Sequence, residues 1–210
     1  MLKALSAYSK RFQLGQSPRE DPSMAFKPLN LLTDAEAVLR ARYYLRSAET
    51  MGPRVRVWGS PVVKNEGRMR IGNRVRLVST IATLELAVGP DGLLELGDQI
   101  LVNYGCSIGA TQLVRIGSGS NIGTHCMLID NSFHELDPAR RNEMPASAPV
   151  ILEENVWLAA RVIVLPGVTI GRNSVIGAGS VVTKDVPANV LAAGVPAKVL
   201  RPLAAGDQRA

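Results

Sequence analysis

The chain has 210 residues, of which 46% are hydrophobic and 20% charged, and this length fits one globular domain rather than two. Aromatic residues make up only 4%, so the core must be built from Val, Ile, Leu and Ala. The formal charge of +6 suits an anionic ligand, but no Lys/Arg run with interleaved aromatic residues is present, which argues against general nucleic-acid binding.

The N-terminal segment gives little structural information. Residues 1–16 carry Lys3, Lys10 and Arg11 without the sustained apolar run of a secretory signal, and no stretch has the length of a membrane span. We therefore expect a cytoplasmic protein, in which Cys106 and Cys126 are reduced packing residues. Residues 1–30 are either partly disordered or packed on a neighbouring subunit, and the sequence leaves both possibilities open.

A helix is predicted next, over residues 34–48. Thr33-Asp-Ala-Glu36 has the spacing of a capping box, and the segment AVLRARYYLRSAE follows it. A helix in this position would cover the first strand edge of a repetitive β-structure, which otherwise invites association. We assign residues 1–50 to an N-terminal arm and helix.

The central feature of the sequence is a repeat with a period of six. Aliphatic residues recur at every sixth position in the C-terminal half, at Leu152, Leu158, Val164, Ile170, Ile176 and Val182. Earlier stretches keep the same period with breaks, beginning at Ile71 and Leu77. Neither an α-helix nor an alternating strand gives a strict six-residue register.

The coils of a parallel β-helix do give this register. Three hexads close one triangular coil, and the aliphatic residue at the first position points inward, with neighbouring coils about 4.8 Å apart. The second position is mostly glycine or another small residue, as at Gly72 and Gly171, because a tight corner needs unusual backbone angles. The predicted fold is all-β, with a β-helix over residues 51–200 and a tail over 201–210.

The repeat is interrupted by a polar loop over residues 130–150. The loop contains His134, one of only two histidines in the chain, with Asp130, Glu135 and Asp137 nearby. Long excursions from a compact repeat are usually functional or disordered. An imidazole titrates near neutral pH, so His134 is a candidate general base.

The segment PVILEENVWLAARVIVLPGVTIGRNSVIGAGSVVTKDVPANVLAAGVPAKVLR resembles the C-terminal half of the hexapeptide-repeat acetyltransferases, which include maltose, galactoside and exopolysaccharide O-acetyltransferases. The segments NYGCSIG and FHELDPARRN are similar to that family's substrate-side motifs. The resemblance covers about residues 68–202. It implies a left-handed parallel β-helix, acetyl-CoA as the acyl donor, and a saccharide hydroxyl as the acceptor.

The resemblance also implies catalytic roles. His134 matches the family's histidine that abstracts the proton of the acceptor hydroxyl, which is a poor nucleophile until then. Asn103 matches the asparagine that helps to hold this hydroxyl. Asp130 is our candidate for the group that orients the imidazole, with Glu135 and Asp137 as alternatives.

For the cofactor, Trp157 matches the tryptophan beside the pantetheine arm, and the backbone N–H of Ala160 matches the group that would stabilise the oxyanion. The remaining matches line the pantetheine and nucleotide groove or meet the CoA phosphates: Ala178, Thr183, Lys184, Lys198 and Arg201. The chain departs from the family's Trp-Ile-Gly pattern at Ala159, whose extra methyl group is expected to narrow this corner.

The family's active site lies between the subunits of a trimer, so we expect a homotrimer with no metal. Three alternatives stay open. A zinc hydratase on the same fold needs three histidine ligands, whereas this chain has only His125 and His134. A non-catalytic β-helix could serve as a binding scaffold. An acyltransferase could instead act on an amine or on a non-sugar alcohol.

Overall fold

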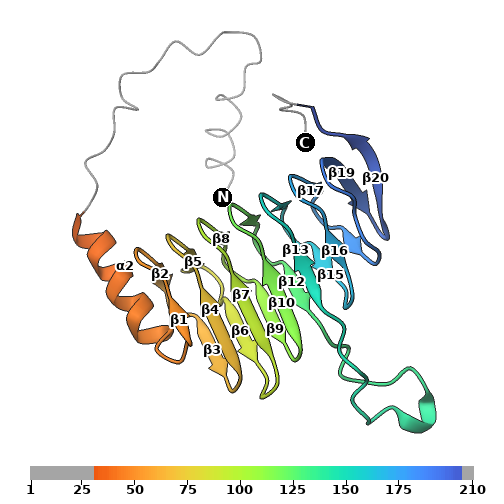
Figure 1. Ribbon diagram of the computed structural model, residues 1–210, viewed down its shortest axis with the longest axis horizontal. Helices are drawn as coiled ribbons and strands as arrows, with labels where there is room; N and C mark the ends of the chain where they lie inside the picture. Colours follow the sequence, from red (N-terminus) through yellow and green to blue (C-terminus); the bar gives the residue numbers. More distant parts are fainter. Residues whose placement is uncertain (1–30, 205–210) are drawn as a thin grey trace, which may run out of the picture.

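The computed structural model describes residues 31–204, with side chains from residue 34 onward. These residues form an elongated solenoid with one helix at its N-terminal end (Figure 1). Its strands belong to three sheets in which all neighbours are parallel except the last pair. The structure therefore confirms the prediction of a left-handed parallel β-helix with a short N-terminal helix.

Helix α2 (Leu31–Tyr44) covers the first coil. Ala37 and Ala41, and Leu45 just beyond the helix, are buried at a spacing of four residues, so one face of the helix packs against strand β2 (Arg56–Gly59). The predicted start was wrong, because the helix begins at Leu31 and Thr33 lies inside it rather than at the capping position. The helix also ends earlier than residue 48.

We name the three sheets A, B and C, in the order in which the chain first enters them. Sheet A contains β1 (Thr50–Met51), β4 (Arg68–Ile71), β7 (Leu93–Leu96), β10 (Leu113–Ile116), β13 (Val150–Leu152) and β16 (Thr169–Ile170). Sheet B contains β2, β5 (Arg76–Ser79), β8 (Leu101–Val102), β11 (Asn121–Ile122), β14 (Trp157–Leu158), β17 (Val175–Ile176), β19 (Val190–Gly194) and β20 (Ala197–Pro202). Sheet C contains β3 (Val62–Asn65), β6 (Glu85–Val88), β9 (Ser107–Ala110), β12 (Met127–Ile129), β15 (Ile163–Val164) and β18 (Val181–Val182).

The predicted aliphatic ladder forms the core. Each of its members is at most 1% exposed, and residues eighteen apart pair in register on adjacent coils: Leu152 with Ile170, Leu158 with Ile176, and Val164 with Val182. Three hexads therefore close one coil, as expected. Burying each such side chain contributes roughly 1.5–3 kcal/mol.

The two cysteines are free and buried among these layers. The Cys106 thiol donates to the carbonyl oxygen of Gly123 at 3.0 Å, and the Cys126 thiol donates to that of Ala159 at 3.1 Å. The neighbouring Cys126 thiol and burial raise the pKa of Cys106, which keeps this thiol protonated. Both cysteines pack in the interior, as the sequence predicted.

The C-terminal end of the solenoid closes with a hairpin. Strand β19 still pairs parallel with β17, but after a cis Val195–Pro196 bond the chain reverses and β20 pairs antiparallel with β19. This last strand reaches Pro202 and so runs past residue 201, where the sequence suggested that a tail begins. No helix within residues 31–204 is both long and apolar enough to cross a bilayer.

The ladder gives a stability prediction. Leu158→Ala should lower the free energy of unfolding by about 2–5 kcal/mol, because it opens a cavity between stacked coils. Val175→Ala, on the outward row of the next strand, should cost less than about 1 kcal/mol. Urea denaturation followed by circular dichroism measures both values at one protein concentration. Equal losses would contradict an inward-facing ladder.

Candidate functional site

The polar loop leaves the solenoid after β12, at the corner between sheets C and A, and projects away from the coils (Figure 1). Its stem is tied together by backbone and side-chain bonds: Ala148 N–H donates to the Asp130 carbonyl at 2.9 Å, and the Asn131 amide donates to the Pro145 carbonyl at 2.9 Å. A short 3-10 helix, η2 (Pro138–Arg140), lies further out. The loop is therefore held in a defined shape by its own polar groups.

The imidazole of His134 is exposed on this loop and is anchored on one side. Its Nδ1 lies 2.9 Å from the carbonyl oxygen of Arg141. Since a carbonyl oxygen can only accept, Nδ1 must carry the hydrogen, and in the neutral ring Nε2 then has the free lone pair. The loop thus presents a fixed nitrogen base to the solvent.

Asp130 does not contact this imidazole. Its carboxylate is fully buried and accepts four hydrogen bonds: from Thr111 N–H at 2.8 Å, and from the Thr111 hydroxyl, Gln112 N–H and Leu113 N–H, each at 2.7 Å. With these bonds the carboxylate fixes the corner of the preceding coil. Asp130 is therefore a structural residue in this chain, which corrects its assignment as the orienting group.

The two alternative carboxylates are also engaged elsewhere. Glu135 lies 3.8 Å and Asp137 lies 3.4 Å from the guanidinium of Arg140. The Asp137 carboxylate also accepts from Ala139 N–H at 2.9 Å and so caps η2. The orienting group of His134 is instead a backbone carbonyl, which no side-chain pattern in the sequence could have signalled.

A second group of predicted residues gathers at the corner between sheets B and C, which we call the B/C corner. Asn103 follows β8, Ala160 follows β14 and Ala178 follows β17. Backbone bonds stack these turns, as when Gly179 N–H donates to the Ala160 carbonyl at 2.9 Å. Within residues 31–204 the Ala160 N–H itself has no acceptor, so it is available to a ligand.

The outward face of sheet B continues this group. Trp157 is 43% exposed and shares one register row with Val175, Leu191 and Arg201 on the next three strands. Lys198 is exposed and pairs with Ala193, beside the turn at Gly177. An aromatic ring, a free N–H and two basic side chains therefore lie along one strip.

The other predicted residues lie at a different corner. Thr183 and Lys184 follow β18 at the corner between sheets C and A, which we call the C/A corner, and His134 extends from the same corner two coils earlier. The two corners are the opposite edges of sheet C. One chain therefore brings His134 near neither Trp157 nor Ala160 through its coils.

The face between the two corners is apolar over the last three strands of sheet C. Met127, Ile163 and Val181 form one outward register row across three strands of sheet C, and Met127 is 42% exposed. Leu165 follows at the edge, 37% exposed. Within residues 34–204, no group of three or more His, Cys, Asp or Glu side chains is arranged to hold a metal ion.

Comparison with known proteins agrees with this architecture. Residues 149–184 match the family model described as bacterial transferase hexapeptide (six repeats). Galactoside O-acetyltransferase of Escherichia coli K12 is 41% identical over 108 residues, which cover 51% of this chain and 53% of that protein. Its counterpart in Lactococcus lactis is 50% identical over 92 residues, covering 41% and 44%. The matched part of the chain thus spans about half the length of these curated relatives.

Solved structures match over a larger share of the chain. A hexapeptide-repeat acetyltransferase of Vibrio cholerae, complexed with acetyl coenzyme A, is 27% identical with a TM-score of 0.59 and covers 85% of this chain and 80% of its own. A galactoside acetyltransferase in complex with coenzyme A is 28% identical with a TM-score of 0.59, covering 87% and 76%. The resemblance predicted from the sequence is therefore confirmed: residues 149–184 are bacterial-transferase hexapeptide repeats, and the fold is that of the hexapeptide-repeat acetyltransferases.

Proposed function

We propose that the chain is an acetyl-CoA-dependent O-acetyltransferase that acts on a hydroxyl group of a sugar or polysaccharide. The observation that carries this proposal is the imidazole of His134, anchored through Nδ1 and open at Nε2, in a chain similar to proteins named galactoside O-acetyltransferases. Solved relatives of the same fold are described as complexes with acetyl coenzyme A or coenzyme A, which supports the choice of donor.

The chemistry is direct transfer. Nε2 of His134 removes the proton of the acceptor hydroxyl while the oxygen attacks the thioester carbonyl carbon. The free N–H of Ala160 donates to the oxyanion of the tetrahedral intermediate. Collapse of this intermediate breaks the C–S bond, and the leaving thiolate recovers the proton from the imidazolium. Asn103 accepts Tyr104 N–H through its Oδ1 at 2.9 Å, so its NH₂ group is free to donate to the acceptor oxygen.

The strip on sheet B is the proposed cofactor site. Trp157 offers its exposed ring to the pantetheine arm, and Ala178 lines the same corner without a bulky side chain. Lys198 and Arg201, on the terminal strand, would bind the CoA phosphates, where charge-assisted hydrogen bonds are strongest. Thr183 and Lys184 would reach this groove only from a neighbouring chain, because they lie at the C/A corner.

We further propose a homotrimer in which the apolar face of sheet C turns toward the threefold axis. This arrangement sets the C/A corner of one subunit against the B/C corner of the next, so that His134 of one chain meets Trp157 and Ala160 of another. Burial of the row formed by Met127, Ile163 and Val181 would supply the driving force.

Removing the base tests the reaction. His134→Ala should lower kcat by roughly 10²–10⁴ while coenzyme A binding stays unchanged, because the imidazole acts on the acceptor and not on the nucleotide. Thiol release from acetyl-CoA with a panel of saccharides, amino alcohols and amines measures the rate, and product mass analysis distinguishes an ester from an amide. Undiminished activity in the variant would refute His134 as the base. A chain that binds coenzyme A but is inactive with every acceptor would instead fit a non-catalytic scaffold.

Subunit mixing tests the shared site. His134→Ala and Trp157→Ala/Lys198→Ala variants should each be nearly inactive alone. Mixed trimers should regain about a third of wild-type activity, since one site in three in any trimer that holds both variants joins an intact His134 to an intact strip on the next chain. Co-expression with two affinity tags, followed by thiol-release assays on the mixed trimers, gives the measurement. Failure to regain activity in verified mixed assemblies would mean that each chain holds a complete site.

A further inference from the structure

The B/C corner carries three side chains that the proposed transfer does not use. Tyr104, His125 and Arg161 lie on three successive coils, and backbone bonds stack them: His125 N–H donates to the Tyr104 carbonyl at 3.0 Å, and Arg161 N–H donates to the Thr124 carbonyl at 2.8 Å. Arg161 directly follows Ala160, whose N–H is the proposed oxyanion donor. The three residues therefore form one column at this corner, next to the proposed oxyanion donor.

The rings of Tyr104 and His125 form an aromatic wall at this corner. Their rings meet edge to face, with centroids 5.7 Å apart and planes at 86°. The imidazole lies over Gly105, where a Cβ atom would collide with it, and Gly105 has a φ of +73° that favours glycine. Because Asn103 holds the Tyr104 N–H at 2.9 Å, this wall stands directly beside the residue proposed to bind the acceptor hydroxyl.

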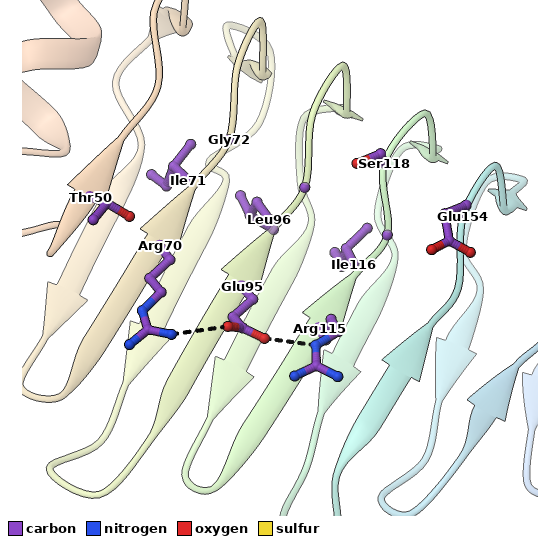
Figure 2. A pocket seen from close by; sticks show the side chains of 12 residues that line it. Thr50, Arg70, Ile71, Gly72, Glu95, Leu96, Arg115, Ile116, Ser118 and Glu154 are labelled. Carbon is purple, nitrogen blue, oxygen red and sulfur yellow. Dashed lines mark hydrogen bonds and ion pairs between the residues drawn. The ribbon is translucent and has the colours of Figure 1, made fainter.

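Arg161 brings an unneutralised cation to the same corner. Its guanidinium is exposed and makes no hydrogen bond or ion pair within residues 34–204. On the outward row of sheet A, by contrast, arginines are paired with an acid: Figure 2 shows Glu95 bridging Arg70 at 3.4 Å and Arg115 at 2.7 Å. At such a row, opposite charges on adjacent strands attract each other.

The outward residues that flank Arg161 include no acid that could take the place of Glu95. The adjoining positions on sheet B are Asn121 and Trp157, and those on sheet C are Met127 and Ile163. Arg161 thus faces a surface of aromatic, amide and apolar groups. Since none of these neighbours is an acid, an anionic group brought by a ligand would be a strong partner for Arg161.

We propose that this corner is an acceptor subsite for an acidic saccharide, in which the sugar ring packs against Tyr104 and His125 and a carboxylate binds Arg161. The turn of Tyr104 lies two coils, or about 10 Å, from that of Ala160, and the turn of His125, whose imidazole leans back over Gly105, lies one coil from it. Guanidinium and carboxylate match in geometry as well as charge. The inference rests on the proposed acetyl transfer and narrows its acceptor class.

Paired acceptors test the subsite. Glucuronate and galacturonate should be acetylated with a kcat/KM about tenfold or more above that of glucose and galactose, through a lower KM. Arg161→Gln should abolish this preference without changing the rate on neutral sugars. Tyr104→Ala should raise KM for both kinds of sugar, because both would use the ring wall. Arg172→Gln, an exposed arginine at the corner between sheets A and B, is the matched control and should leave the preference intact.

Binding measurements separate this inference from the proposed reaction. Calorimetry on the His134→Ala protein should detect glucuronate, and the added Arg161→Gln change should remove that binding while coenzyme A binds as before. If wild-type protein treats acidic and neutral sugars alike, or if Arg161→Gln weakens coenzyme A instead, the subsite assignment is wrong. If no sugar is ever acetylated but glucuronate still binds through Arg161, the proposed reaction fails and the subsite stands.

Discussion

The structure depends on the stacking of one coil upon the next, through backbone hydrogen bonds and through aliphatic residues that meet their equivalents eighteen positions later. Leu152 on Ile170 and Leu158 on Ile176 are examples in which both contacts coincide. Since every coil repeats the same three corners, residues at one corner form a column along the solenoid. A functional surface in such a fold is therefore formed by columns of residues. Residues that are distant in sequence become neighbours because they occupy the same corner on successive coils.

The loop over residues 130–149 interrupts this repetition. The preceding coil therefore loses a backbone acceptor that a regular coil would supply. In regular coils a strand's first N–H donates to the next coil, as Leu93 N–H does to the Gln112 carbonyl at 3.0 Å. Leu113 instead donates to the Asp130 carboxylate at 2.7 Å, because the chain has left the solenoid there. Asp130 thus replaces a missing backbone acceptor. This explains why a carboxylate next to His134 in sequence makes no contact with it.

Sheet C separates the candidate site residues into two sets. One edge carries His134, Thr183 and Lys184, and the other carries Asn103, Ala160 and Ala178. The sheet between them presents the side chains of Met127, Ile163 and Val181 outward in one row. In the proposed trimer this face would both hold the subunits together and bring the two sets into contact, so that activity would depend on assembly.

The sequence by itself determined the six-residue period, the inward ladder, the buried cysteines and the position of the interrupting loop, because these follow from local pattern and glycine placement. It misplaced the start of α2 and missed β20, since helix ends and a closing hairpin depend on what packs against them. Only the tertiary structure decided that the Arg141 carbonyl anchors His134, and that Tyr104, His125 and Arg161 share one corner. A backbone acceptor has no sequence signature, and columns exist only once the coils are stacked.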